Sequence, residues 1–574
     1  MNKYISKLML ALGLCTLFAF SACSDDKGNY TYDEKNVITI ENIPAQTSLL
    51  AGAEYIDIKP VITSSIDGVI SDNDPNYSFT YKRKDSEGNW VDMGDTKNLY
   101  LLATLSAGTH NCYFAVTDKR TGVQTITPFT LRATTITSEG WLVLCNEGPD
   151  EKARMDMLSQ ISVGRIIPTH DILRTESDVP QLYHATQIGY VRTYANFGSK
   201  LVMLTETGSY LIPTADNRAY GEITTVTPAD ELKINQFLAP TTDHPITYTV
   251  IPYASYGRPN AILITSKEGN AYAMNCRATD MAGAFELPIN TSKRGEAPEY
   301  KVAPYVGATE LRYDGLSSAY GDALLYDTDN KRFIKWSSKG LNENVGRTDD
   351  DSQGITQRCT PLVDPTSGKK FSFQTGMDMV CMLNTANPSG TVYCIMKDGN
   401  KRHVYAIDVI TDEFRQLDAF EDIQAPNFDK ATCFAASSQY SVIYYGYQNK
   451  IYSYNLSTKA TSEITLGANE EVTMLKFNHY DEPWGVGSQI RTGFLKNMDE
   501  DTRNIYLARE RQLIVGTYDS SVTDNNGGIL RFYEVSNGGM TLTLKKDKDE
   551  NNADRTWEFK GFAKIKDVRY KEVL

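Results

Sequence analysis

The sequence is short of positive charge, of histidine and of the short motifs that mark common catalytic sites. Its 574 residues hold 58 Lys and Arg against 72 Asp and Glu, a formal net charge of −14. Because binding to duplex nucleic acid needs a basic face that displaces counterions, no nucleic-acid partner is expected. Only six His are present, and HExxH, GxSxG, GxxxxGKS/T and GxGxxG are all missing. The common zinc-peptidase, serine-hydrolase, P-loop and dinucleotide signatures are therefore absent, and no cofactor is predicted.

The cysteines form no pattern typical of a disulfide framework or a zinc site. Two of the nine lie near the N-terminus, and the other seven form an odd set without any CxxC pair. Several of them sit inside apolar runs, so we predict buried free thiols that pack as small hydrophobic residues, and no metal site. A single disulfide stays open as an alternative. The seven are Cys112, Cys145, Cys276, Cys359, Cys381, Cys394 and Cys433.

The apolar run at the N-terminus is too short to span a membrane. Leu8 to Phe20 comprises 13 residues, whereas a helix needs about 20 to cross a ~30 Å hydrocarbon core. Lys3 and Lys7 precede this run and small residues follow it. That order is typical of a signal peptide, which we assign to residues 1–22.

A lipidation site follows the signal peptide directly. Ser21 and Ala22 lead into Cys23 as in a bacterial lipobox, although Phe20 stands where Leu is more common. Two or more acyl chains on Cys23 would hold the chain stably on a membrane, at about 0.8 kcal/mol for each buried CH₂. We therefore predict a lipid-anchored protein with a tether at residues 23–35. Plain secretion, with Cys23 incidental, is the alternative.

The first folded region is predicted to be a β-sandwich of the Ig or PKD type at residues 36–133. Short strands alternate with turns, as in Val37 to Ile40, Tyr77 to Tyr81 and Gly108 to Asp118. About seven such strands in about 100 residues are typical of a sandwich. Trp90 is interpreted as a core or edge packing residue.

A repeat occupies residues 134–574 and predicts the second domain. Its unit is a short apolar strand, a polar turn and a second strand, and it occurs seven times at intervals of 50 to 71 residues. This spacing suits four-stranded propeller blades better than the rungs of a solenoid. The repeats cover 141–147, 201–212, 261–274, 323–336, 392–407, 442–455 and 513–535.

The last strand is predicted to complete the first blade. Six of the seven hairpins have a candidate inner strand before them, near 187–195, 247–254, 314–320, 373–383, 432–437 and 472–479. The hairpin at Trp141 has none, and residues 563–571 form an alternating strand with no hairpin after it. We therefore predict an all-β chain in which a seven-bladed propeller is closed by the C-terminal strand.

These features together resemble the PKD-like family lipoproteins of Bacteroidetes. The resemblance rests on Cys23 to Tyr32 (CSDDKGNYTY), on the sandwich, and on Trp557 to Phe562 (WEFKGF) before the closing strand. The acidic stretch Ser24 to Lys27 resembles the surface-export signal of such lipoproteins; an ordinary linker is the alternative. The resemblance implies an outer-membrane surface protein that accompanies a SusC/SusD-type uptake system. It supplies no catalytic residues.

Two loops are the candidate ligand sites. The loop at 479–492 (HYDEPWGVGSQIRT) holds one Pro and two Gly and carries a Trp, and long loops in compact domains are often functional. A loop that packs its own Trp against the ring is the alternative interpretation. The loop at 253–258 (YASYGR) has a similar character. The candidate ligand-binding residues are His479, Tyr480, Trp484, Arg491, Tyr253 and Tyr256.

Other aromatic and acidic clusters are interpreted as structural. Tyr444, Tyr445, Tyr452 and Tyr454 alternate within strands and are predicted to pack. The run that starts at Asp547 loosely resembles an EF-hand loop, but it has no Gly at position six and no flanking helices. We predict a solvated hairpin tip there rather than a calcium site.

The function predicted from the sequence is non-catalytic binding of glycan or peptide nutrients at the cell surface. A propeller-fold polysaccharide hydrolase or lyase is one alternative, because sequence alone cannot place two carboxylates about 5 to 9 Å apart. A structural scaffold subunit of the importer is the other.

Overall fold

The computed structural model describes residues 35–572 apart from twelve internal segments. These segments are 174–178, 193–198, 215–222, 235–242, 253–258, 276–287, 292–296, 309–321, 338–357, 388–389, 411–412 and 479–498. The described residues divide into two compact units. The first comprises residues up to Thr47, Tyr55–Leu101 and His110–Leu131, and the second comprises Ser48–Glu54, Leu102–Thr109 and the chain from Arg132 onward.

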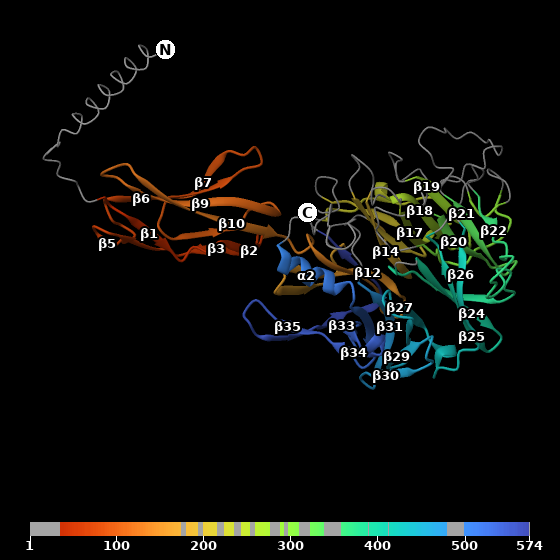
Figure 1. The fold of residues 1–574 in the computed structure, drawn as a ribbon. Coiled ribbons are helices and arrows are strands. Elements are labelled where there is room, and N and C mark those ends of the chain that lie inside the picture. The colour runs from red at the N-terminus through yellow and green to blue at the C-terminus, as the bar shows by residue number, and fades with distance from the viewer. Residues whose placement is uncertain are drawn as a thin grey trace, which may run out of the picture. The chain divides into compact units, whose positions relative to one another are not determined.

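The first ten strands form three sheets, which Figure 1 shows in red to orange. The largest has the order β2-β10-β9-β6-β7, with β1-β4-β5 and β3-β8 as the smaller sheets. Buried and exposed residues alternate along β6 and β9, as the sequence predicts, but the strands number ten rather than about seven. Their bounds are β1 (Ile38–Glu41), β2 (Gln46–Leu50), β3 (Tyr55–Ile58), β4 (Val61–Ser64), β5 (Gly68–Val69), β6 (Tyr77–Lys84), β7 (Trp90–Gly94), β8 (Leu99–Leu102), β9 (Gly108–Asp118) and β10 (Gln124–Thr134).

Seven sheets follow along the second unit, and each of the first three contains one predicted hairpin. The first has the order β13-β12-β11-β38, the second β14-β15-β16 and the third β17-β18-β19. The bounds are β11 (Gly140–Glu147), β12 (Lys152–Ser162), β13 (Arg165–Thr169), β14 (Ala185–Arg192), β15 (Ser199–Thr205), β16 (Tyr210–Ile212), β17 (Pro245–Pro252), β18 (Pro259–Ser266), β19 (Ala271–Asn275) and β38 (Lys564–Lys571).

The next three sheets have the same plan. Their orders are β20-β21-β22, β23-β24-β25-β26 and β27-β28-β29-β30. The inner strand predicted near 314–320 lies outside the described residues. The bounds are β20 (Asp322–Asp327), β21 (Arg332–Ser337), β22 (Thr360–Pro361), β23 (Asp378–Leu383), β24 (Thr391–Asp398), β25 (Lys401–Asp408), β26 (Arg415–Phe420), β27 (Cys433–Ala436), β28 (Val442–Tyr447), β29 (Lys450–Asn455) and β30 (Thr461–Thr465).

The seventh sheet carries additions to the four-stranded plan, of which the sequence predicted only the hairpin at Asp547. Its order is β31-β32-β33-β34, β37 also pairs with β33, and β35 and β36 form a separate hairpin. Helix α2 (Glu500–Arg509) stands between its first two strands. The strands are β31 (Glu470–Phe477), β32 (Leu513–Asp519), β33 (Gly528–Ser536), β34 (Thr541–Leu544), β35 (Lys546–Lys548), β36 (Asp554–Thr556) and β37 (Glu558–Phe562).

The C-terminal strand completes the first sheet. β38 pairs antiparallel with β11, with Trp141 opposite Tyr570 and Val143 opposite Val568. This is the pairing predicted from the sequence. Gly140, at the start of β11, has φ +138°, and a Cβ there would lie 2.2 Å from the carbonyl oxygen of Leu158. Only glycine therefore fits at the point where the first unit's chain enters this sheet.

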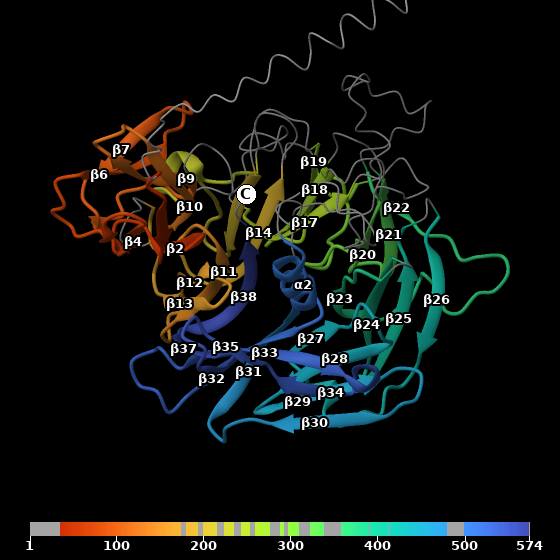
Figure 2. The same cartoon turned by 60° about the vertical axis from the view of Figure 1, so that its left-hand side comes forward.

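The core of the second unit lies between successive sheets. Each sheet shares a buried hydrophobic cluster with the next one along the chain, from the first to the seventh. A further cluster joins the seventh sheet to the first, where Trp141 and Val143 pack with Ile514 and Phe532. Figure 2 shows the same order, with the sheets following one another around α2.

The packing predictions for Tyr and Cys are confirmed among the described residues. Tyr444, Tyr445, Tyr452 and Tyr454 are buried in the sixth sheet. The described cysteines of the body form no disulfide, and all are buried except Cys433, which is half-buried. Burial raises the pKa of the Cys112 thiol to about 11 and also raises the pKa of the others, so they stay protonated and pack as apolar groups.

Candidate functional site

The residues predicted from the sequence as ligand contacts all lie outside the described part of the chain. His479, Tyr480, Trp484 and Arg491 fall in 479–498, and Tyr253 and Tyr256 fall in 253–258. The lipidation site Cys23 also precedes the first described residue. The described strands that lead into the two segments, β31 and β17, nevertheless show where each segment begins.

Each of six sheets has a leading strand, the one that pairs with the first strand of its hairpin: β38, β14, β17, β23, β27 and β31. Three of these strands start side by side. The backbone N–H of Ala185, which begins β14, donates to the Asn146 side chain at 2.9 Å, and Asn146 pairs with Lys564 at the start of β38. Lys564 in turn lies 3.8 Å from Glu471, at the start of β31.

The start of β17 lies beside the start of β14. Ala185 pairs with Thr205, so the turn that follows Thr205 marks the beginning of β14. In that turn the hydroxyl of Ser209 donates to the carbonyl of Pro245 at 3.0 Å. Pro245 is the first residue of β17, and β17 therefore runs in the same direction as β14.

Contacts at the carboxyl ends of the leading strands indicate the same direction. Asn478, immediately after β31, accepts a hydrogen bond from the Trp141 indole at 2.9 Å, and Trp141 lies opposite the end of β38. Ala386, which follows β23, donates its N–H to Ser438, which follows β27, at 3.0 Å. β38, β14, β17 and β31 thus end on one side of the second unit, called here the carboxyl-end face, and β23 and β27 likewise end beside each other. The strands that precede the two candidate segments, β17 and β31, are among those that end at this face.

A buried carboxylate connects three chain segments at the carboxyl-end face. Glu139, 2% exposed, accepts hydrogen bonds from the hydroxyls of Tyr506 on α2 and Tyr570 on β38, the latter at 2.6 Å. Its other donors are Arg132 and Gln160, each at 2.9 Å. These contacts satisfy the buried charge, and they fix the segment from Arg132 to Glu139, helix α2 and strand β38 to one another.

An aromatic group surrounds the neighbouring guanidinium. Arg509 at the end of α2 is 1% exposed and donates to Gln160 at 2.7 Å. Its guanidinium carbon lies 5.2 Å from the ring centroids of Trp141 and Trp557 and 4.8 Å from that of Tyr506. Cation–π attraction is strongest when the pair is desolvated, so this arrangement holds α2 against the junction of the first and seventh sheets.

A second basic side chain, that of Lys545, is buried against Trp557, and burial disfavours its protonated form. The Lys545 ammonium nitrogen lies 3.8 Å from the Trp557 ring centroid. Burial, followed by the positive charge of Arg509, lowers the pKa of Lys545 to about 7. Between about pH 7 and pH 10.4 the unfolded chain therefore binds more protons at this position than the folded chain, and stability rises with pH.

Replacing this lysine should stabilise the protein at low pH. We expect Lys545→Met to raise the free energy of unfolding by about 2–4 kcal/mol at pH 6. Removal of the buried charge stabilises the folded state, and the lost cation–π attraction to Trp557 offsets part of this gain. The gain should shrink towards zero near pH 10. Urea unfolding across this pH range tests it. Lys548→Met, which removes an exposed lysine paired with Asp554 at 2.6 Å, is the control and should change little.

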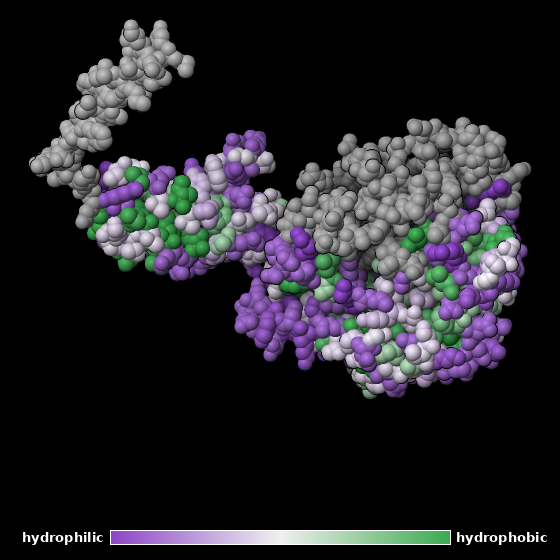
Figure 3. All heavy atoms as spheres, in the orientation of Figure 1, coloured by the Kyte–Doolittle hydropathy of each residue, from purple (hydrophilic) through white to green (hydrophobic). Residues whose placement is uncertain are grey.

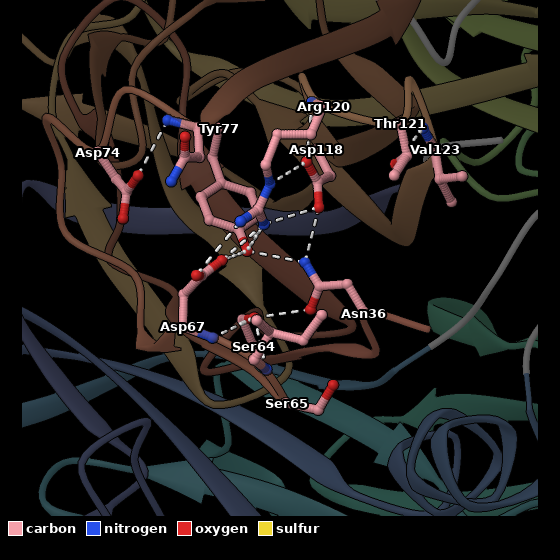
Figure 4. A network of polar contacts seen from close by, with 12 residues as sticks. Asn36, Ser64, Ser65, Asp67, Asp74, Tyr77, Asp118, Arg120, Thr121 and Val123 are labelled. Atoms are coloured by element: carbon pink, nitrogen blue, oxygen red, sulfur yellow. Dashed lines mark hydrogen bonds and ion pairs between the residues drawn. The ribbon is translucent and has the colours of Figure 1, made fainter. Parts of the chain in front are cut away.

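In the first unit, a polar cluster fixes the start of the described chain (Figure 4). The Asn36 amide donates to the Tyr77 hydroxyl and to the Asp118 carboxylate, each at 2.8 Å. Its own carbonyl oxygen accepts from the Ser64 hydroxyl at 2.6 Å. Residues at the starts or ends of β4, β6 and β9 thus hold the chain where the predicted tether would end.

Arg120 provides the charge of this cluster. Its guanidinium contacts Asp67 at 2.6 Å and Asp118 at 2.9 Å. The Arg120 guanidinium, together with Asn36, holds the pKa of Asp118 well below its usual range. The cluster is therefore an ion-paired anchor for the start of the described chain.

The acidic run at Asp547 forms the predicted hairpin tip. β35 and β36 pair there, and Asp547 binds Arg555 at 2.6 Å. Across the described residues no group of three or more His, Cys, Asp or Glu side chains could hold a metal ion. Among the described residues of the whole chain, no helix has the length and apolar character needed to cross a membrane.

A cavity of about 220 Å³ lies between the fifth and sixth sheets. Phe420, Ile423, Tyr454 and Leu456 supply its apolar lining, and Glu421 is among its polar residues. Its volume is below the roughly 300–1,000 Å³ of ordinary small-molecule pockets. The cavity is therefore a weaker candidate for a ligand-binding site than the carboxyl-end face.

Comparison with known proteins bears on the N-terminal part. Residues 23–179 match the profile of the PKD-like family. This match confirms the PKD-like part of the resemblance for these residues, and it runs beyond the predicted boundary at 133 through β11, β12 and β13. A search of curated proteins found no match.

Solved structures give only distant similarity to this chain. A quinonprotein alcohol dehydrogenase-like protein of Bacteroides thetaiotaomicron is 10% identical, with a TM-score of 0.35 over 92% of this chain and 97% of its own. The extracellular domain of a one-component system from the same species is 10% identical, with a TM-score of 0.29 over 67% and 38%. Kluyveromyces lactis Hsv2 is 8% identical, with a TM-score of 0.32 over 71% and 93%. At these scores no function is transferred.

Proposed function

We propose that this chain is a lipid-anchored cell-surface protein that binds glycan or peptide nutrients without transforming them. In this role it serves a SusC/SusD-type outer-membrane uptake system. The lipobox at Cys23 and the acidic residues after it support the location. The match to the PKD-like family supports the resemblance from which the association with a transporter is inferred.

We further propose that the seven sheets are the blades of a closed β-propeller. Three observations support this architecture: the pairing of β38 with β11, the common direction of the leading strands, and the hydrophobic cluster that joins the seventh sheet to the first. A ring of this kind leaves no long exposed edge strand and gathers its connecting loops on two faces.

The common direction of the leading strands is the observation that carries the binding proposal. β17 and β31, which directly precede 253–258 and 479–498, end on one face, and we propose that both segments contribute to a site there. Tyr253, Tyr256, His479, Tyr480, Trp484 and Arg491 would then supply aromatic rings and polar groups from two directions to one ligand. Such rings stack on sugar faces and contact peptide side chains.

An array experiment tests this function. A soluble chain from residue 24 onward, which lacks the lipidation site, would be screened against glycans and peptides, and we expect at least one class to bind and to be recovered unchanged. Trp484→Ala should weaken that binding about tenfold or more.

Other outcomes of the screen favour the rival functions. Recovery of cleaved glycan would contradict the non-catalytic role and favour a hydrolase or lyase. A chain that binds nothing on the arrays but co-purifies with the transporter would favour a scaffold subunit. Unchanged affinity in Trp484→Ala would remove this residue from the site.

A further inference from the structure

Exposed hydrophobic side chains are concentrated in the first unit. Among the described residues, 11 of the 15 large hydrophobic side chains that are exposed belong to it, although it is much the smaller unit. Figure 3 shows the hydrophobic residues of this unit, in green, among hydrophilic ones. Isolated exposed residues need no explanation, but a group on one face marks a binding surface.

One of these residues, Trp90, lies on the outer face of the five-stranded sheet. Residues opposite one another in a ladder share a face. Lys84 lies opposite Trp90, Lys82 lies opposite Asp92, and Lys82 also lies opposite Tyr113 on the next strand. These five side chains, from β7, β6 and β9, therefore share one side of the sheet, and it is the side opposite the buried Tyr81 and Phe114.

The aromatic residues of this face form a defined platform. The Trp90 and Tyr113 ring centroids lie 4.6 Å apart at an interplanar angle of 71°, and the Lys84 ammonium lies 5.4 Å from the Trp90 centroid. Trp90 is 42% exposed. Contacts with Tyr113 and Lys84 restrict the indole, so a ligand that stacks on it meets a ring that is already positioned.

The charges of the face favour a neutral ligand. Lys82 pairs with Asp92 at 3.1 Å, and the Asp92 side chain is 75% exposed. Asn111, two residues from Tyr113 on the same side of β9, adds an exposed amide. An anionic membrane surface would need a cluster of unpaired cations, whereas this face has one ion pair and one further lysine.

We propose that this outer face, formed by Trp90, Tyr113, Lys82, Lys84, Asp92 and Asn111, binds a neutral polysaccharide chain by stacking sugar rings on Trp90. A flat sheet face without a pocket fits an extended polymer that lies across the strands. The ammonium, carboxylate and amide groups donate to and accept from sugar hydroxyls. This inference rests on the proposed function: it adds a second contact surface and selects glycan over peptide.

The test is affinity electrophoresis of the mature full-length chain in gels that contain starch, dextran, xylan or mixed-linkage β-glucan. We expect retardation by at least one neutral polysaccharide. Trp90→Ala should reduce the affinity about tenfold. Val91→Ala changes a 37% exposed neighbour that faces the other side of β7, and it should bind as the wild type does. Equal thermal midpoints of the two variants exclude misfolding.

The outcomes separate this inference from the proposed function. Retardation that survives Trp90→Ala but is lost in Trp484→Ala overturns the platform and leaves nutrient binding in place. Binding of peptides alone has the same effect. Loss of binding to anionic lipid vesicles in Trp90→Ala, with no polysaccharide bound, assigns the face to a membrane and also overturns the inference. A chain that binds neither glycan nor peptide overturns both proposals.

Discussion

Deletion of residues 564–574 is expected to abolish cooperative folding of the second unit. The deletion removes β38 and with it the buried side chains of Ile565, Val568 and Tyr570. Burial of each large side chain contributes about 1.5–3 kcal/mol, so the loss approaches the 5–15 kcal/mol by which domains are stable. β11 would also become an unpaired edge, and Glu139 would lose a hydrogen-bond donor.

Urea unfolding followed by circular dichroism and size-exclusion chromatography measures this effect. If the deleted chain does not accumulate, Val568→Asp, which places a charge at a 2% exposed position, provides a second route. Lys566→Ala, at an exposed position two residues earlier on the same strand, is the matched control. A truncated chain with the midpoint and cooperativity of the intact protein would contradict the structural role given to β38.

Cys23→Ala is expected to move the protein from the membrane fraction to the soluble fraction. Without an acceptor thiol no acyl chain can be attached, and two or more chains are what makes anchoring stable. The expected shift is from nearly all protein in the membrane pellet to nearly all in the supernatant. Cys15→Ala is the matched control, because it changes a cysteine within the predicted signal peptide and should leave the distribution unchanged.

Fractionation followed by mass spectrometry of the N-terminal peptide reads out this prediction. The wild-type peptide should begin at Cys23 and carry the mass of its acyl groups. A Cys23→Ala protein that stays in the pellet through washes with high salt and carbonate would contradict lipid anchoring. A wild-type mature chain that begins at another residue and carries no lipid would favour plain secretion.

Much of the fold could be predicted because it rests on local pattern. Each hairpin is a pair of apolar strands around a polar turn, and this pattern is visible within about 15 residues. The role of the last strand followed from counting, since the hairpin at Trp141 lacked a partner and the strand at 563–571 lacked a hairpin. The pairing of β37 with β33 in the seventh sheet was not predicted, because the hairpin of β35 and β36 separates β37 from the repeat.

Helix α2 was missed although its sequence carries the usual signals. Asp499 caps its N-terminus by accepting from the N–H of Thr502, acidic residues fill the first turn, and Arg509 stands in the last. The preceding residues, with one Pro and two Gly, were predicted to be a loop, and the helix after them was not predicted.

The polar cluster at the carboxyl-end face is a different case. The Glu139 contact to Tyr506 spans 367 residues and its contact to Tyr570 spans 431. No short motif encodes such pairs, so they become visible only once the fold is known. The outer-face platform of the first unit was also beyond reach, because the alternation showed that Trp90 lies on a strand but not which side of the sheet it faces.

Hydrogen exchange measured by mass spectrometry on the intact chain tests the central structural claim most directly. The claim is that the end of the polypeptide forms an integral strand of the first sheet. Peptides that cover β38 and β11 should both fall in the most slowly exchanging class and should open together as denaturant is added, because their amides share one ladder. Rapid exchange throughout 564–571, with β11 still protected, would contradict the account.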